Sequence, residues 1–461
     1  MKSTSSSLTT GSIPRTLFAF ALPILMGNML QSINGSVNAI WVGKFLGTAA
    51  LTATNNSNIV MFLLLGGVFG ITMASTILIA QAVGAQRMDE AKRVVGTSTT
   101  FFMVLALLFT VGGVSFSRHV LGWMATPQDA LPLAVAYMRV MFLALPASYA
   151  FFFINAALRG AGDSRTPFYF MLLAVVLDIA LNPIFIFGLG PIPALGIAGS
   201  ATATLVSQVV SLLALLRHVY RRRNPLTLRR GDLGLLRIDW SIVWTLVLKG
   251  IPMGLQMIVL SSTMVLFMHV VNRFGSDTAA AFAASMQLWN YVQMPALAIG
   301  AAVSSMAAQN IGARLWDRVA LTARYGVLFN FALTGVPVLV IYLASRHAIG
   351  VFLPPGSVSV GIAEHINHIV LWSFPLFGIS MVLSGVVRAA GAVVVPLLVL
   401  AVAMLGVRVP LAFIAVDHWG ADGVWWSFSI SSVVAATLMG VYYRFGNWRA
   451  ARMMPTAAGA D

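Results

Sequence analysis

Long apolar runs separated by short polar connections dominate the chain. Many of these runs contain about 20 residues without a charge, and an α-helix of that length covers the roughly 30 Å hydrocarbon core of a bilayer. The pattern predicts an all-α polytopic membrane protein. Its twelve transmembrane helices are expected at about residues 16–42, 52–80, 94–117, 131–157, 167–188, 195–218, 241–270, 281–308, 320–344, 364–387, 395–416 and 421–443.

Charged positions inside these runs are few. One carboxylate, Asp178, lies in the middle of the fifth predicted span, and we find no other acid well inside a span. A carboxylate at mid-membrane costs about 2.5–3.5 kcal/mol on insertion scales, so its presence favours a functional role. The alternative is a structural aspartate that is hydrogen-bonded to a neighbouring helix.

Polar residues of other spans fall at a depth similar to that of Asp178. Asn182 follows it by four residues and shares its helix face, and counting along the first and sixth spans adds Asn34, Asn38 and Thr204. A carboxylate with amide and hydroxyl oxygens suits H⁺ or a hard cation such as Na⁺. We therefore predict a cation-coupling site from these five residues, with no metal site beyond Na⁺. Hydrogen bonding between helices is the alternative for the amides and the hydroxyl.

A second polar set could line a substrate cavity. Its members share a place inside or at the start of predicted spans, mostly in the C-terminal half, beside aromatic residues whose faces bind organic cations. They are Gln31, Gln256, Gln287, Asn290 and Arg408. Ordinary interfacial placement and core packing are the alternative. Pro23 and Pro183 interrupt helical hydrogen bonding within spans and are predicted hinges.

Composition restricts the class of protein. The chain has 461 residues, of which 59% are hydrophobic and only 9% charged, and this composition is not that of a soluble protein. The net charge is +15, but the basic residues that produce it lie in loops between spans, so it does not indicate nucleic-acid binding. There is no cysteine, which excludes disulfides, thiol catalysis and cysteine metal sites.

The basic residues also predict orientation. Arginines and lysines concentrate in alternate connections and in the C-terminal tail, whereas the other connections hold only Lys44, Arg118, Arg273 and Arg346. The positive-inside rule then puts both termini in the cytoplasm. We expect the protein to lie in the cell's inner (plasma) membrane.

The chain repeats itself in two halves. Pro23 matches Pro252 at an offset of 252 − 23 = 229, and Pro167 matches Pro396 at the same offset. Since each half has six spans, the halves enter the membrane the same way and form a parallel 6+6 repeat. We predict a six-helix bundle over 1–218, a basic cytoplasmic linker over 219–240 and a second six-helix bundle over 241–461.

Several motifs resemble the multidrug and toxic compound extrusion (MATE) family, and the resemblance covers essentially the whole chain. The motifs are ALP at Ala21–Pro23, VNAIWVGKFLG at Val37–Gly47, AQAVGA at Ala80–Ala85, NAALRGAGDSRTP at Asn155–Pro167, and the segment Asn182–Thr204. Family members often carry Asp where this chain has Asn38, and Asn followed by Asp where this chain has Asp178 followed by Asn182.

The resemblance implies two bundles facing each other in a V. It also implies export of organic, often cationic, compounds in exchange for H⁺ or Na⁺ by alternating access. We expect a monomer without cofactors that binds small organic molecules and is not an enzyme. A lipid-linked oligosaccharide flippase of the same superfamily is the closest rival, although intramembrane cations are few. A membrane-embedded enzyme ranks lower, because the paired aspartates that would hold Mg²⁺ are missing from the sequence.

Overall fold

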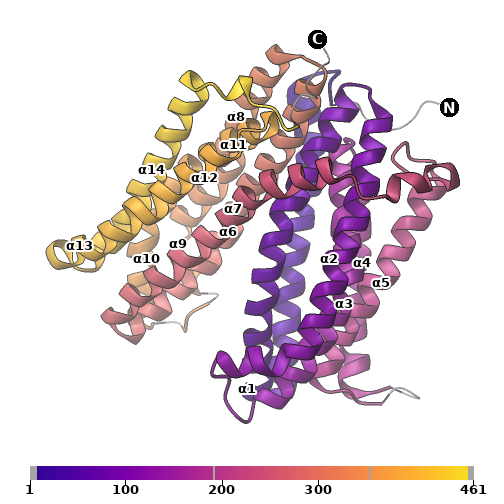
Figure 1. The fold of residues 1–461 in the computed structure, drawn as a ribbon. Coiled ribbons are helices and arrows are strands. Elements are labelled where there is room, and N and C mark those ends of the chain that lie inside the picture. The colour runs from indigo at the N-terminus through magenta and orange to yellow at the C-terminus, as the bar shows by residue number, and fades with distance from the viewer. Residues whose placement is uncertain (1–7, 190–192, 351, 355, 455–461) are drawn as a thin grey trace. The chain divides into compact units, whose positions relative to one another are not determined.

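The computed structural model describes residues 8–189, 193–350, 352–354 and 356–454, and these residues form an all-α protein (Figure 1). Eleven of its described helices are long and apolar enough to cross a membrane. One of them, α1 (Ile13–Gly84), contains the first two predicted spans. They are separated at Gly47, where the backbone leaves the helical conformation with φ 85° and ψ −178°. Glycine adopts this left-handed φ without steric cost. Counting α1 twice gives twelve crossings and confirms the predicted fold class.

The described residues divide into two units. The first holds those from Met26 to Val247, and the second holds those up to Leu25 together with those from Leu248 onward. Both divisions fall inside helices, close to Pro23 in α1 and to Pro252 in α6. The first turns of α1 therefore group with the second unit.

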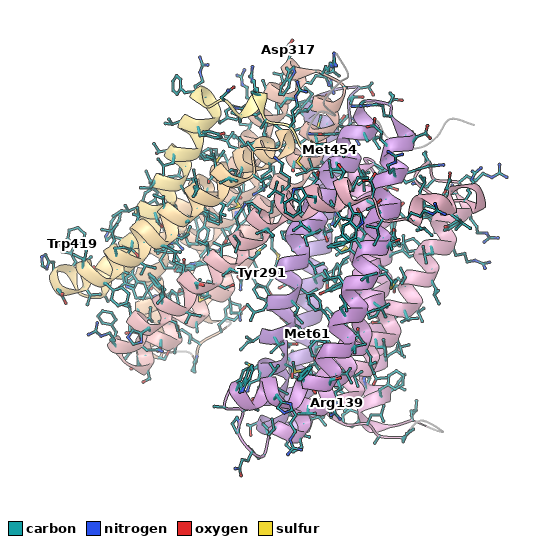
Figure 2. All side chains as sticks on the ribbon, viewed as in Figure 1. Met61, Arg139, Tyr291, Asp317, Trp419 and Met454 are labelled. Atoms are coloured by element: carbon teal, nitrogen blue, oxygen red, sulfur yellow. The ribbon has the colours of Figure 1, made fainter. Side chains whose placement is uncertain are left out.

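The first unit is built from the remainder of α1 and four further long helices, in which α2 packs on α3 and α5 packs on both α3 and α4 (Figure 1). The four helices are α2 (Met88–Trp123), α3 (Leu131–Gly160), α4 (Arg165–Phe187) and α5 (Ile197–Arg221). The arginine-rich end of this unit is the end where α3 finishes and α4 begins, which carries Arg159 and Arg165. The exposed side chain of Arg139 lies near the opposite end (Figure 2).

The basic linker is attached to the first unit. Its short helix η1 (Arg230–Leu236) packs on α2, where Lys92 pairs with Asp232 at 2.9 Å and Thr100 donates to the carbonyl of Leu236 at 2.7 Å. The backbone N–H of Arg229 and then Lys92 hold the pKa of Asp232 below its usual range. A carboxylate with a lowered folded-state pKa stabilises the fold at neutral pH, and this contribution is lost only as the pH falls through that lowered value, below about 3.9.

The second unit is built from α6 to α14. Its elements are α6 (Trp240–Val271), η2 (Asn272–Phe274), α7 (Ser276–Gly312), α8 (Trp316–Leu343), α9 (Ser345–Gly350), α10 (Val358–Val370), η3 (Leu371–Ser373), α11 (Phe374–Ala390), α12 (Val394–Ala401), η4 (Val402–Arg408), α13 (Val409–Trp419), α14 (Ala421–Phe445) and η5 (Trp448–Ala450). The tenth span is α10 and α11 joined by η3, and the eleventh contains the π-helical segment η4. Helix α11 packs against α7, α8 and α14.

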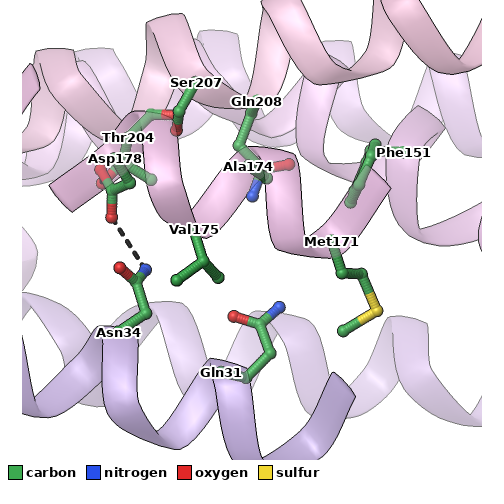
Figure 3. Close-up of a pocket in the computed structure, with 10 residues that line it drawn as sticks. All are labelled: Gln31, Asn34, Phe151, Met171, Ala174, Val175, Asp178, Thr204, Ser207 and Gln208. Carbon is green, nitrogen blue, oxygen red and sulfur yellow. Dashed lines mark hydrogen bonds between the residues drawn. The ribbon is translucent and has the colours of Figure 1, made fainter. Parts of the chain in front are cut away.

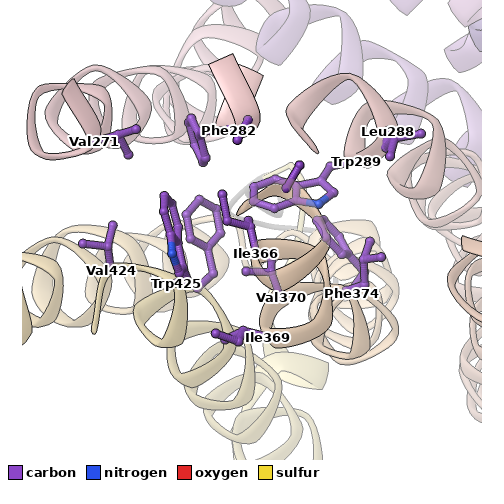
Figure 4. Packing of buried hydrophobic residues seen from close by; sticks show 14 of the residues in the cluster. Val271, Phe282, Leu288, Trp289, Ile366, Ile369, Val370, Phe374, Val424 and Trp425 are labelled. Atoms are coloured by element: carbon purple, nitrogen blue, oxygen red, sulfur yellow. The ribbon is translucent and has the colours of Figure 1, made fainter. Parts of the chain in front are cut away.

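An aromatic core fills the second unit (Figure 4). Phe282 stacks on Trp425 with ring centroids 5.7 Å apart, and Trp289 is 2% exposed and donates its indole N–H to Asn367 at 2.8 Å. Buried rings contribute large apolar areas, and a buried indole N–H requires an acceptor. The residues around Leu8 join this unit, since Leu8 is fully buried and exchanges hydrogen bonds with Gln309 and Asn310.

Packing of the linker depends on Gly96 of α2. A Cβ at this position would collide with the carbonyl oxygen of Leu235, so we expect Gly96→Ala to displace η1 and destabilise the protein by about 1–3 kcal/mol. Gly112 of the same helix has open space around it, and Gly112→Ala should leave stability unchanged or raise it slightly. Thermal unfolding of the detergent-solubilised protein measures both effects. Equal melting temperatures for the two variants would contradict the close approach.

Candidate functional site

The Asp178 carboxylate is buried in the first unit and is solvated by side chains of two other helices. Asn34 and Asn38 of α1 donate to Oδ2 at 2.8 and 2.9 Å, and Thr204 of α5 donates to Oδ1 at 3.0 Å. The Asp178 side chain is 2% exposed. Three donors on two oxygens stabilise the charged form of a carboxylate that has lost its hydration.

Local sequence explains why the three helices present these groups to one point. Asn34 and Asn38 lie one turn apart on α1 and so share a face. Helix α5 approaches α4 closely at Gly199, where a Cβ would collide with the carbonyl oxygen of Phe185. The missing side chain lets Thr204, about one turn further along α5, reach the carboxylate.

Asn182 forms the second layer of the site. Its side chain is fully buried, and its Nδ2 donates to Asn38 Oδ1 at 2.7 Å and to the carbonyl of Asp178 at 2.9 Å. Asn38 is therefore oriented by Asn182 while it donates to the carboxylate. The structure brings together all five residues of the predicted cation-coupling site.

The charge of Asp178 is balanced by dipoles. None of the ion pairs found among the described residues includes it, and it is the only carboxylate that is buried in that part of the chain. The buried phenol of Tyr137 on α3 lies close enough to interact with its charge. Sequence reasoning missed Tyr137, although a hydroxyl-bearing ring in an apolar span was a usable signal.

The oxygen atoms around Asp178 fit a small monovalent cation. Asn34 Oδ1 and Asn182 Oδ1 are buried and accept no hydrogen bond from the described residues. Together with the carboxylate and the Thr204 hydroxyl they offer the neutral and charged oxygens that Na⁺ or a proton would use. Within the described ranges no three His, Cys, Asp or Glu side chains gather as a metal site would require.

The residues of the predicted substrate cavity are dispersed. Gln31 lines a pocket beside Asp178 (Figure 3). In the second unit, Gln256 accepts a hydrogen bond from Arg388 Nη1 at 2.9 Å, while Arg408 donates to Ser431 at 2.9 Å and lies 4.1 Å from the Phe428 ring centroid. Gln287 and Asn290 are exposed on α7.

Of the predicted hinges, Pro23 lies inside α1 and Pro183 inside α4, and both helices continue past the proline. Pro23 lies two residues before the division between the two units at Leu25 and Met26. Pro183 follows Asn182 directly, so it adjoins the residues around Asp178.

Comparison with known proteins gives consistent results. The MatE family model matches residues 23–184 and again residues 252–414, once in each half of the chain. A probable multidrug resistance protein of Bacillus subtilis, YoeA, is 36% identical over 94% of both chains, and a second from the same organism, YpnP, is 30% identical over 96% of this chain and 98% of its own. The solved outward-facing structure of a multidrug resistance MATE family transporter superposes with a TM-score of 0.88 at 23% identity, covering 96% of this chain and 98% of the other.

The two α1 amides differ in what they support. Asn38 both donates to Asp178 and accepts from Asn182, whereas Asn34 makes a single hydrogen bond, to the carboxylate. We expect Asn38→Leu to lower stability by about 2–3 kcal/mol and the matched Asn34→Leu by about 1 kcal/mol, because the first substitution removes two hydrogen bonds and the second removes one. Thermal unfolding in detergent measures both stabilities. An Asn34→Leu variant that melts at or below the melting temperature of Asn38→Leu would contradict the larger structural role of Asn38.

Proposed function

We propose that this chain, which belongs to the MatE family of multidrug efflux transporters, exports organic, often cationic, compounds in exchange for H⁺ or Na⁺ that binds at Asp178. One observation carries the proposal. The only carboxylate buried among the described residues lies within a membrane-spanning helix and is held by three neutral donors. A charge maintained at that depth is costly, and intramembrane acids mark ion pathways.

The hydrogen bonds allow for a change of charge. A protonated carboxyl must donate one hydrogen bond, so one of its three present donors has to become an acceptor. Thr204 can do so, because its hydroxyl also lies 3.3 Å from the carbonyl of Ser200 and can turn its proton there. A bound Na⁺ would instead take the carboxylate and the unpartnered oxygens of Asn34 and Asn182 as ligands.

Neutralisation of Asp178 couples the cation to the substrate. With the carboxylate charged, the interior of the first unit attracts a cationic compound, and with H⁺ or Na⁺ bound that attraction is lost. One charge that crosses about 100 mV supplies about 2.3 kcal/mol, which sustains roughly a 50-fold concentration gradient. We propose that the helices then bend at Pro23 and Pro183 as the transporter alternates its access.

The setting of this activity follows from the same premises. We propose that a single chain works in the plasma membrane. Both termini then lie in the cytoplasm, because arginines concentrate in alternate connections. The relatives that are named multidrug resistance proteins favour this function over an oligosaccharide flippase or an enzyme.

Replacing the carboxylate tests the proposal. In proteoliposomes, efflux of a fluorescent cationic dye is driven by a pH gradient and, separately, by a Na⁺ gradient. We expect Asp178→Asn to reduce gradient-driven efflux at least about tenfold, because the neutral amide cannot exchange its charge with the coupling ion.

Asp129→Asn is the matched control, since that carboxylate is exposed in the connection between α2 and α3 and should leave efflux unchanged. The gradient that drives wild-type efflux identifies the coupling ion. Equal efflux by wild type and Asp178→Asn would remove Asp178 from the mechanism.

A further inference from the structure

A pocket extends from Asp178 into the first unit toward the arginine-rich end (Figure 3). Polar side chains line it near the carboxylate, from α1 with Gln31 and Asn34 and from α5 with Ser207 and Gln208. Phe151 and Met171 lie at its other end. Because α4 begins at the arginine-rich end, Met171 is about 10 Å nearer that end than Asp178.

Buried oxygen atoms without hydrogen-bond partners continue in the same direction. Gln208 Oε1 borders the pocket, Ser211 Oγ lies one turn further along α5, and Asn155 Oδ1 lies one turn beyond Phe151 on α3. Each accepts nothing from the residues that the structure describes. Leaving such a group unpaired costs about 1–3 kcal/mol, so a series of them in one direction requires a partner that is not a protein group.

The series spans most of the distance from Asp178 to the membrane surface. Ser211 lies about 15 Å before the end of α5, and Asn155 lies about 8 Å before the end of α3. All three oxygen atoms are acceptors in an apolar setting, where a hydrated proton or a small metal cation gains most from them.

An apolar cluster closes the series in this conformation. Phe151, Leu158, Ala174, Leu215 and Val219 pack together around the level of Ser211 and Asn155. Arg159 follows Leu158 on α3, so the chain carries a positive charge and not a further acceptor at this end of the series. The arrangement is that of a passage with a gate and not of a storage site.

We propose that the coupling cation passes between Asp178 and the arginine-rich side of the membrane through the interior of the first unit, by way of Gln208, Ser211 and Asn155. This inference rests on the proposed cation coupling at Asp178. Movement of Phe151 and Leu215 opens the passage, and the cation then leaves without sharing the route of the exported compound.

The absence of cysteine from the chain provides a direct test, because a single introduced thiol is then unique. Ag⁺, a small cation that reacts with thiols, is added to one side of proteoliposomes that contain Ser211→Cys. We expect Ag⁺ to block dye efflux faster from the arginine-rich side, which is identified by its accessibility to trypsin, than from the opposite side. Ser285→Cys is the matched control, since Ser285 of α7 is also buried with an unpartnered hydroxyl but lies in the second unit, and Ag⁺ should leave it active.

Transport rates complete the test under both the pH and the Na⁺ gradient. Gln208→Leu and Ser211→Ala each remove one acceptor and should slow gradient-driven efflux about fivefold, while their melting temperatures report on folding. Loss of efflux in Asp178→Asn with wild-type rates in both of these variants, or block of Ser211→Cys only from the opposite side, would overturn the passage alone. Undiminished efflux in Asp178→Asn would overturn the proposed coupling and the passage with it.

Discussion

Solvation of one buried carboxylate by neutral dipoles is the constraint on which the first unit depends. Removing a carboxylate from water without a partner is prohibitively costly, and Asp178 has no counter-ion among the described residues. Its charge persists because α1 and α5 bring Asn34, Asn38 and Thr204 within 3.0 Å. The close approach of α5 to α4 at Gly199 and the orientation of Asn38 by Asn182 follow from this requirement. The same groups that hold the charge can release it, since amides and a hydroxyl reorient at little cost.

Much of this site could be predicted from the sequence because it follows from counting. A residue's depth in the membrane is its distance from the span end multiplied by a fixed rise, so Asn38, Asp178 and Thr204 could be assigned to one level. The duplicated halves and the twelve crossings rest on the same regularity of apolar runs, and even the break at Gly47 fell between two predicted spans.

Rotation about the helix axis and side-chain direction were harder to predict. Trp289 precedes Asn290 of the predicted cavity set, yet it is buried in the aromatic core, since an indole that finds Asn367 as an acceptor packs as an apolar ring. Gln256 is paired with Arg388, which repeats Arg159 at the offset of 229, and depth along the spans does not predict this pair. Asn155 lies at a different depth from Asp178, so counting along the spans leaves it outside the predicted coupling site. Its unpartnered oxygen becomes meaningful only once Phe151 is known to line the pocket one turn before it.

The most direct test of the account is whether the cation and a cationic substrate compete for the charge of Asp178. Equilibrium binding of a cationic dye to the purified transporter would be measured across pH and across Na⁺ concentration, for wild type and Asp178→Asn. We predict that wild-type dye affinity falls as the coupling cation rises, with one cation displaced per dye, and that Asp178→Asn binds dye independently of that cation. The same cation dependence in both proteins would contradict the central role of Asp178.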